Sequence, residues 1–364
     1  MASRLRTGPG ARFHRLVGVG GIGTGLVFAL EGDHDLGRNE SRPARLLDVR
    51  DYCKLHIIAH YPAALLGARA SGDPFHVVPV GRVGADGAGR RLTAEMAEVG
   101  MDVRYVEAVA DRPTQLSVCF QYPDGSGANV TTTESAASAL GASDLDLVAD
   151  LLDERTIALA APEIPLPARR RLLDLATARG SFRVLALASS EVPDASDLLS
   201  RADLVALNED EAAALAGQRF DPARTGEFLK RVQDALAVLQ PSASLLVTAG
   251  PEGAYGFDTG SWTRCPALAV PVAGTAGAGD ALLGGVLAGL AAGLPFTPPA
   301  PPSAGAGPRP IASALELGSC LAAFAVTSPH TIPPGVTLDL LLSFARDHGL
   351  TFDDALRVCD EVPA

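Results

Sequence analysis

The sequence predicts an α/β protein with a mostly parallel central sheet, because short apolar runs alternate with amphipathic helical segments along most of the chain. Strands separated by helices of this length are typical of βαβ units. Buried parallel strands are apolar without alternation, and Leu204–Leu207 has this composition. The predicted strands are Arg15–Val19, His76–Val80, Arg183–Leu187, Asp203–Leu207 and Ser244–Thr248. The predicted helices are Gly89–Val99, Leu166–Arg179, Glu209–Ala216, Gly226–Leu239 and Gly279–Ala292.

Two regions interrupt this alternation and predict a small antiparallel β element beside the main sheet. Residues 31–53 are mostly polar, and residues 111–138 contain β-type runs around the turn Pro123–Gly127. The α/β core is then discontinuous and consists of residues 14–30, 54–110 and 139–345. Residues 295–310 are rich in proline and alanine and predict a surface insertion without secondary structure.

Composition and charge narrow the class of protein. The net charge of −12 over 364 residues excludes the basic stripe that nucleic-acid binding requires. The apolar run Ala281–Leu294 is too short to span a membrane, so we expect no membrane partner. An arginine-rich start before Leu16–Leu30 resembles a signal peptide, but the glycines in that stretch favour a strand and a turn. Five dispersed cysteines favour the reducing cytoplasm.

The clearest chemical motif is Gly274–Gly279 followed by Asp280. The segment after it has apolar residues at helical spacing, so the glycines lie where a loop becomes a helix N-terminus. Free amides and the helix dipole make such a place an anion site, and small residues allow close approach of a phosphoryl group. An acid in the first turn can also simply favour the helix dipole.

Two further segments have both a functional and a structural interpretation. Asn208 and Glu211 follow a predicted strand and could organise a hard cation, or could form a capping box at a helix start. Val247–Ala254 contains Thr248, Gly250 and Gly253, and could be an ordinary glycine-proline turn.

Taken together, these segments resemble the ribokinase-like, or PfkB, carbohydrate kinase family. Gly277-Ala278-Gly279-Asp280 is similar to the C-terminal signature of that family. The resemblance implies a three-layer fold with a mostly parallel sheet flanked by helices, plus a small β lid formed by residues 31–53 and 111–138. It also implies transfer of the γ-phosphoryl group of ATP to a hydroxyl of a sugar, sugar phosphate or nucleoside. Asp280 is then the general base, and Gly277, Ala278 and Gly279 form the anion hole.

The same resemblance assigns the cofactors and a partner. Asn208 and Glu211 match the Asn-x-x-Glu motif of the family and would hold Mg²⁺ through water. The implied nucleotide-binding residues are Asn208, Glu211, Thr248, Gly250, Gly253 and Thr275. Val80–Gly89 is similar to the Gly-x-x-Gly-x-Asp-x-x-Gly segment of the family. Lids of the family pair between subunits, so the resemblance allows a homodimer through the lid.

The chain departs from the family pattern in the segments that bind substrate. An aspartate that grips sugar hydroxyls in the family is replaced by Gly23 or Gly25, and Asp51–Ile58 lacks the expected glycine pair and asparagine. Substitute polar groups for the substrate are predicted at Asp33, Asn39, Lys54, His56 and His60. Convergence of Arg38, Lys54 and the histidines would favour an anionic acceptor. Pro62 predicts that the helix in this region begins only near that residue.

Two alternatives belong to other classes of protein. Gly18–Gly23 satisfies the G-x-G-x-x-G pattern of dinucleotide-binding oxidoreductases, which requires a helix at the glycines and an acid closing the next strand. Glu40 does not close an apolar strand, which opposes this hypothesis. A ribokinase-fold binding or regulatory protein without turnover is the second alternative, and the intact Asp280, Asn208 and Glu211 oppose it.

Overall fold

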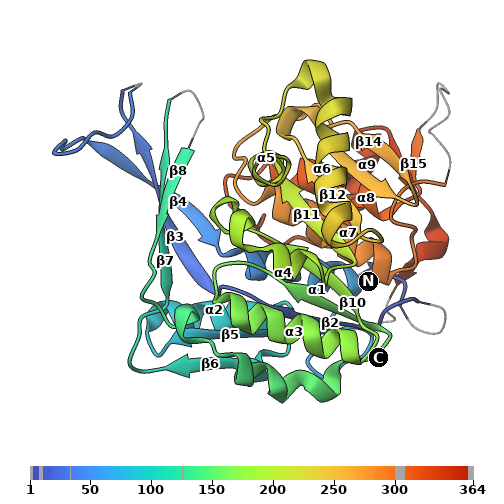
Figure 1. Ribbon diagram of the computed structural model, residues 1–364, viewed down its shortest axis with the longest axis horizontal. Coiled ribbons are helices and arrows are strands. Elements are labelled where there is room, and N and C mark those ends of the chain that lie inside the picture. The colour runs from blue at the N-terminus through green and yellow to red at the C-terminus, as the bar shows by residue number, and fades with distance from the viewer. Residues whose placement is uncertain (1–2, 8–10, 33, 124–126, 300–307, 360–364) are drawn as a thin grey trace.

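The computed structural model describes residues 3–7, 11–32, 34–123, 127–299 and 308–359, and its main feature is a nine-stranded sheet (Figure 1). The strand order is β14-β13-β12-β11-β10-β9-β2-β5-β6. The strands from β12 to β6 are parallel, and β13 and β14 are antiparallel at the other edge. The strands are β2 Arg15–Val19, β5 His76–Gly84, β6 Val106–Val109, β9 Thr156–Ala160, β10 Phe182–Ala186, β11 Leu204–Asn208, β12 Ser244–Thr248, β13 Ala254–Asp258 and β14 Ser261–Cys265.

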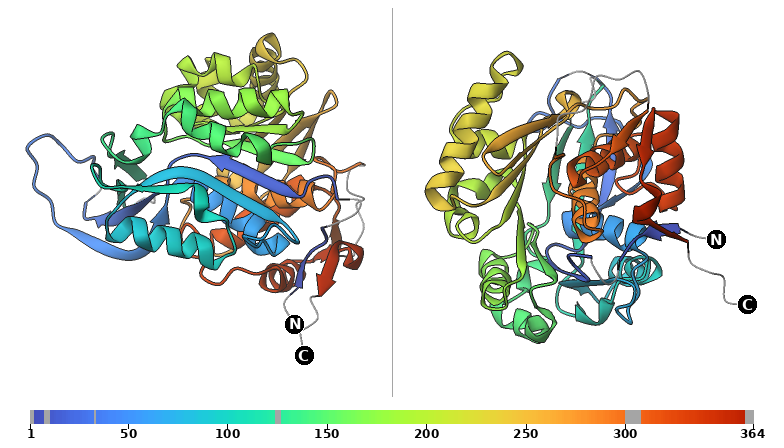
Figure 2. Two further views of the ribbon diagram at one scale, coloured as in Figure 1. Left: turned by 90° about the horizontal axis from the view of Figure 1, so that it is seen from below. Right: turned by 90° about the vertical axis from the view of Figure 1, so that its right-hand side faces the viewer.

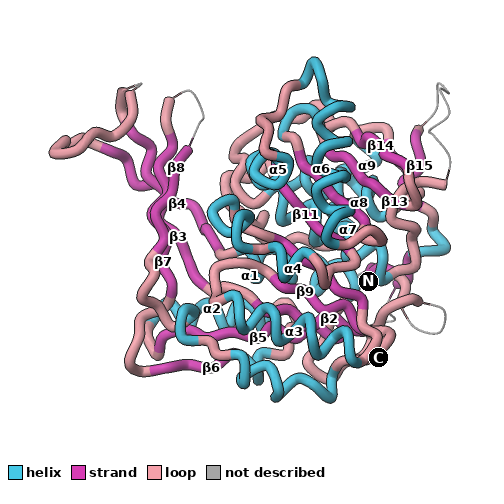
Figure 3. Tube along the Cα trace, in the orientation of Figure 1, coloured by secondary structure: helices cyan, strands magenta, loops and turns pink. Residues whose placement is uncertain are grey.

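Helices cover both faces of this sheet, which confirms the predicted three-layer α/β fold (Figures 2 and 3). Alternate strand residues enter different cores: Leu16 and Leu159 pack on one face, Val17 and Ala158 on the other. The first face carries α1 Lys54–Leu66, α2 Gly87–Glu98, α7 Ala278–Ala291, α8 Ala314–Ala325 and α9 Leu338–Asp347. The second face carries α3 Leu166–Ala178, α4 Ser196–Leu199, α5 Glu209–Ala216 and α6 Thr225–Leu239.

A separate four-stranded sheet, called the lid below, stands away from the body at the left of Figure 1. Its order is β4-β3-β7-β8, with β3 Gly23–Leu30, β4 Ala44–Tyr52, β7 Gln115–Gln121 and β8 Gly127–Thr131. The pairing of β3 with β7 is parallel, so the lid is a mixed sheet rather than an antiparallel one. Residues 23–30 also pair in the lid, whereas the sequence placed them with the core. Because glycine is a weak strand former, Gly23 and Gly25 kept the sequence pattern from predicting this strand.

The two faces of the lid differ in polarity because side chains alternate along each strand. The residue pairs Gly25–Asp51, Gly25–Ser117 and Ser117–Thr131 place one polar row on a single face, called the inner face below. The opposite, outer face carries Leu26, Phe28, Leu46, Val118 and Val130. The predicted turn of the β7–β8 hairpin includes residues 124–126, which lie outside the described residues.

Two short sheets tie together distant parts of the chain. β1 Ser3–Leu5 pairs with β17 Arg357–Cys359, and β15 Arg309–Ile311 pairs with β16 Leu350–Phe352. Of the predicted insertion 295–310, residues 300–307 are outside the described part, and Arg309 and Pro310 belong to β15. In the described ranges we find no helix that is both long enough and apolar enough to cross a membrane.

The expectation that the helix near Pro62 begins at that residue is wrong. α1 begins at Lys54, and Pro62 lies inside it. Proline leaves the Ile58 carbonyl without its helical amide partner. That carbonyl faces Gly284 of α7, where an added Cβ would come within 2.8 Å of it. The glycine therefore allows α1 and α7 to pack closely, which brings their N-terminal ends together.

The dinucleotide-binding hypothesis is also wrong. The glycines from Gly18 to Gly23 connect β2 directly to β3 of the lid, and no helix starts there. The amides that would hold a pyrophosphate at a helix N-terminus are therefore missing from this segment.

Candidate active site

The chemically important side chains gather at the carboxyl ends of the parallel strands. Glu163 follows β9, Leu187 follows β10, and Asn208 and Thr248 are the last residues of β11 and β12. Asn208 and Thr248 are also cross-strand partners. Ligands of open α/β sheets bind at this end of the strands. The topology therefore brings the Asn208 and Thr248 segments to the same edge, as the sequence motifs required.

Asp280 lies in the first turn of α7, at the same edge. Gly277 has a φ of 78° and packs against Thr331, where an added Cβ would come within 2.9 Å of the Thr331 carbonyl. Only glycine adopts this turn without strain. The amide of Ala278 donates to the Thr275 carbonyl at 3.2 Å, whereas the next amides of a helix start have no carbonyl in their own helix to bind. The free end of α7 thus suits an anion.

Lys54 connects this turn to Glu211 at the start of α5. It is the first residue of α1, and its Nζ donates to the Leu187 carbonyl at 2.8 Å and to Glu211 Oε1 at 3.1 Å. Its charge also acts on Asp280. One ammonium group therefore lies among the ends of β10 and β11 and the first turn of α7.

The carboxylates around Lys54 shift one another's pKa values. Burial raises the pKa of Asp280 to about 6; Lys54 lowers it, and Glu211 and Asp51 raise it. Burial lowers the pKa of Lys54, but Asp280 and Glu211 outweigh burial, so the net pKa is raised. At neutral pH Lys54 is charged and Asp280 is mostly ionised, which is the state that a general base needs.

Asn208 and Glu211 form a capping box at the start of α5. The Asn208 amide donates to Glu211 Oε2 at 2.8 Å, and the Glu211 amide donates to Asn208 Oδ1 at 2.8 Å. Glu211 Oε1 also accepts from Asn208 Nδ2 at 3.0 Å and from Lys54. The interpretation of Asn208 and Glu211 as a capping box is therefore correct. It does not exclude a second role in organising a hard cation. Because Asn208 Oδ1 and the Glu211 carboxylate already accept hydrogen bonds, they suit a cation that they contact through water. Mg²⁺ is such a cation, since it usually keeps several of its own waters.

The described part of the chain holds no cluster of three or more His, Cys, Asp or Glu side chains arranged to bind a metal ion directly. A cation here would depend on water and on phosphate oxygens for most of its ligands, which fits Mg²⁺ and not Zn²⁺.

Two carboxylates in this region were not among the sequence candidates. Glu163 has a φ of 72° and accepts from the Lys54 amide at 3.2 Å. Burial raises its pKa to about 7, a hydrogen bond from Cys53 lowers it, and Asp280 raises it. A non-glycine residue at positive φ is a strained position typical of functional sites. Asp51 lies on the inner face of the lid and acts electrostatically on Asp280. Glu163 could have been found as an acid that lies shortly after a buried strand, separated from it by Ala161 and Pro162.

The predicted substrate-binding residues lie in different parts of the molecule, and not all of them are near the site. Lys54 lies in the site, and Asp33 is outside the described residues. Asn39 is exposed in the loop at the far end of the lid, five strand residues or about 17 Å beyond Gly25.

His56 and His60 lie two and six residues after Lys54, on the other side of α1. Burial, with lesser contributions from His60 and Arg91, lowers the pKa of His56 to about 3, and burial lowers that of His60 to about 4. Both are neutral at pH 7, so they supply no charge for an anionic acceptor.

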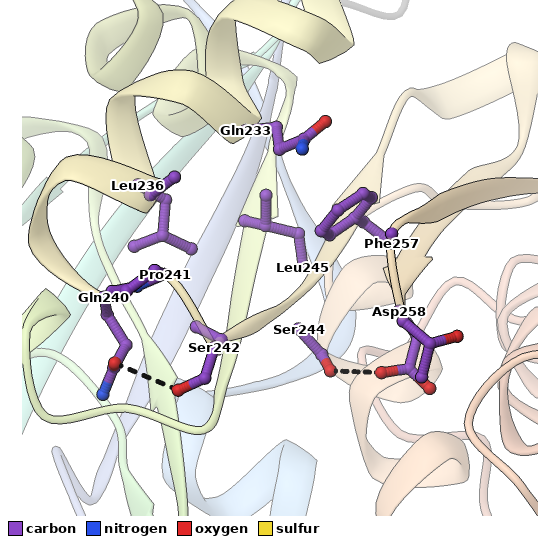
Figure 4. A pocket seen from close by; sticks show the side chains of 13 residues that line it. Gln233, Leu236, Gln240, Pro241, Ser242, Ser244, Leu245, Phe257 and Asp258 are labelled. Atoms are coloured by element: carbon purple, nitrogen blue, oxygen red, sulfur yellow. Dashed lines mark hydrogen bonds between the residues drawn. The ribbon is translucent and has the colours of Figure 1, made fainter.

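Two cavities lie outside this site. Figure 4 shows one of about 410 Å³ beside α6 and the β12–β13 hairpin, where Ser244 donates to Asp258 at 2.9 Å. Ser244 begins β12, so this cavity is at the opposite end of the strand from Thr248. A second cavity of about 600 Å³ lies at the base of the lid, on the outer face, between Tyr52 and the start of α2.

Comparison with known proteins identifies the class of protein that this fold and site define. The family model described as pfkB family carbohydrate kinase matches residues 62–337. The chain therefore belongs to the pfkB family of carbohydrate kinases, whose members are phosphotransferases with an alcohol group as acceptor.

Individual relatives agree with this assignment. A fructokinase of Klebsiella pneumoniae is 31% identical over 242 residues, which are 63% of this chain and 75% of that protein. The uncharacterized sugar kinase YegV of Escherichia coli is 38% identical over 109 residues, but the match spans only 29% of this chain and 32% of that protein. Arabidopsis thaliana ribokinase, solved with ribose and ATP, superposes with a TM-score of 0.67 at 18% identity, over 92% of this chain and 99% of that one, and so shares the fold.

The charge of Lys54 predicts a measurable change in Asp280. Replacement of Lys54 by methionine removes the charge that lowers the pKa of Asp280, so we expect that pKa to rise from about 6 by about 1 or more. Carboxyl-detected NMR titration measures it, with the signal assigned by its loss in Asp280→Asn. Lys230, the only other lysine of the chain, lies exposed on α6, and Lys230→Met is the matched control. An unchanged titration in Lys54→Met would show that the two groups do not interact.

Proposed function

We propose that this protein transfers the γ-phosphoryl group of ATP to a hydroxyl of a small, neutral, carbohydrate-like acceptor, with Asp280 as general base. The observation that carries the proposal is the position of Asp280, a carboxylate with a raised pKa in the first turn of α7, next to the free amides of that turn. Phosphoryl transfer depends mainly on alignment and on stabilisation of charge, which such a site supplies.

Each residue has a role in this mechanism. Asp280 accepts the proton of the acceptor hydroxyl as its oxygen attacks the γ-phosphorus. The amides at the start of α7, within the Gly277, Ala278 and Gly279 turn, bind the oxygens of the transferring phosphoryl group. Because the Ala278 amide already donates to the Thr275 carbonyl, we assign the anion hole chiefly to the amides of Gly279 and Asp280. Lys54 keeps Asp280 ionised near neutral pH and balances its charge.

The nucleotide and the metal belong to the neighbouring strand ends. We propose that Thr248, Gly250, Gly253 and Thr275 line the ATP site, because the Thr248 segment ends β12 beside Asn208 and next to Gly279. Mg²⁺ would be held through water by Asn208 and Glu211, and it would offset phosphate charge when bound. The solved Arabidopsis ribokinase complex with ribose and ATP supports the choice of ATP as the phosphoryl donor.

The charge of the site favours an unphosphorylated acceptor. Asp280 acts electrostatically on Glu163, and Asp51 acts on Asp280. A second phosphate close to these carboxylates would be unfavourable, because like charges repel and Lys54 is already bonded to Glu211. A neutral sugar, polyol or nucleoside offers hydroxyl donors instead.

The Asp280→Asn variant tests the mechanism. It removes the base and leaves the fold of α7, so we expect phosphorylation of the acceptor to fall by about 10²–10⁴-fold. The measurement is ATP-dependent phosphorylation across a panel of sugars, polyols and nucleosides. In the wild type, kcat/KM should fall as the pH drops below about 6, because Asp280 becomes protonated.

Asp234→Asn is the control, because this exposed carboxylate on α6 pairs only with Lys230 among the contacts described. Activity that survives in Asp280→Asn would contradict the proposed base. Absence of phosphorylation in the wild type with every acceptor would favour the alternative of a binding protein without turnover.

We also propose that two copies pair through the outer face of the lid. Leu26, Leu46 and Val130 are 40%, 56% and 66% exposed there, which is unusual for three neighbouring aliphatic side chains on one face of a sheet. The double variant Leu46→Asp/Val130→Asp should be a monomer by light scattering where the wild type is a dimer. Val238→Asp, which changes an exposed valine of α6, should leave the mass unchanged. A monomeric wild type would refute the pairing.

We propose the cytoplasm as the location of the reaction. All five cysteines are free, and three of them, Cys53, Cys265 and Cys320, are buried. Unpaired thiols of this kind fit a reducing compartment.

A further inference from the structure

The inner face of the lid carries a carboxylate in an unusual position. Gly25 of β3 pairs with Asp51 of β4, and paired residues on neighbouring strands point to the same face. A Cβ built on Gly25 would collide with the Asp51 carboxylate and would lie 2.8 Å from Asp51 Cγ. The side chain of Asp51 therefore fills the space that a side chain at position 25 would occupy.

This arrangement makes the two positions interdependent. A glycine at 25 is required because the carboxylate of Asp51 lies over it, and the Asp51 carboxylate can lie there because residue 25 has no side chain. The chain thus holds one carboxylate at this point of the inner face, supplied by β4 and not by β3.

The surroundings of Asp51 contain hydrogen-bonding groups but no cation that pairs with it among the described residues. Its Oδ2 accepts from the Cys119 thiol at 3.6 Å, and a thiol is a weak donor. Ser117 lies next to it in the same cross-strand row, bonded to Thr131 at 2.8 Å. The Tyr52 amide also lowers the pKa of Asp51 through a hydrogen bond, but no charged group within the described ranges neutralises this partly buried carboxylate, so a ligand that donates hydrogen bonds to it would be favourable.

A polar atom without a hydrogen-bond partner in the described part of the chain lies at the base of the same face. Gln115 is two residues before Ser117 on β7, is 4% exposed, and its Oε1 has no hydrogen-bond partner. This oxygen and Glu163 Oε2 both lie 2.8 Å from the place of a Cβ on Gly21, so Gln115 points toward the strand-end site. The Asp51 carboxylate and Gln115 Oε1 can therefore both accept hydrogen bonds from a ligand bound on the inner face of the lid, near Asp280.

We propose that Asp51 binds hydroxyl groups of the phosphoryl acceptor, with Gln115 as a second acceptor for the same ligand. This inference rests on the proposed function and specifies which residue of the lid selects the substrate. The ligand must offer at least two hydroxyl donors, one toward Asp51 and one toward Asp280. Burial raises the pKa of Asp51, opposed by hydrogen bonds from Cys119 and Tyr52, as expected for a carboxylate that lacks a cation.

The direct test is the kinetics of Asp51→Ala with D-ribose, D-fructose and adenosine as acceptors. Loss of hydroxyl hydrogen bonds to a carboxylate should raise the acceptor KM by about tenfold or more. The KM for ATP should stay within about twofold, because Asp51 lies on the lid and not at the nucleotide segments. Asp48→Ala, on the same strand but exposed and beside the outer cavity, is the matched control and should behave as wild type.

A relocation variant separates a binding role from a structural one. In Gly25→Asp/Asp51→Gly the carboxylate moves to the paired position on β3, and we expect part of the acceptor affinity to return. Asp51→Asn keeps the shape and guards against loss of folding, which thermal melting of each variant monitors.

The outcomes separate this inference from the proposed function. If acceptor KM is unchanged in Asp51→Ala and Asp51→Asn while Asp280→Asn is inactive, the kinase stands and the role of Asp51 is refuted. If the wild type phosphorylates only an anionic acceptor such as fructose 6-phosphate, the neutral acceptor of the proposed function is refuted, and the role of Asp51 stands only if Asp51→Ala raises the KM for that acceptor. If the wild type phosphorylates nothing, both fail.

Discussion

The placement of one ammonium group among several carboxylates is the constraint on which the rest of the site depends. Lys54 bonds to the Leu187 carbonyl and to Glu211 and stabilises the charge of Asp280. Without it, Asp280 and Glu211 would repel each other at the edge of a buried sheet. The choice of residue is informative, since only two of the 30 basic residues are lysines. A compact ammonium can bind the Leu187 carbonyl and Glu211 and still act as a point charge on Asp280, a role that differs from the planar, bidentate binding of a guanidinium.

The fold serves this placement. Lys54 is at the start of α1 and Asp280 is near the start of α7, so their relative position follows from how these helices pack. Gly284 lets α7 approach the Ile58 carbonyl that Pro62 leaves free, and Gly285 lies against Gly318 of α8. Thr331 joins the lid to the same unit, because it contacts Gly277 and also accepts from the Tyr52 amide beside Asp51. The positions of Asp280, Lys54 and the lid are therefore fixed by one set of close contacts.

The sequence predicted those parts of the site that are encoded locally. Asp280 after the glycines and the Asn208–Glu211 pair each lie within a few residues of a strand or helix boundary, so their resemblance to the family motifs can be recognised from short segments. Asp51 could not be found in this way, because its role follows from the register of β3 and β4, which the loop between them does not reveal. The helix α1 was placed too late because Pro62 usually starts a helix, and here the packing of α7 accommodates it. The family model matches from residue 62 onward, and the departures in the substrate-binding segments lie before that point.

The structure of the protein bound to Mg²⁺ and a non-hydrolysable ATP analogue tests the central claim most directly. The account predicts that the terminal phosphate lies on the free amides at the start of α7, with the Asp280 carboxylate facing it across the space for an acceptor hydroxyl. It also predicts that Lys54 stays between Asp280 and Glu211. A nucleotide bound elsewhere, or an Asp280 side chain separated from the terminal phosphate by protein, would contradict the account.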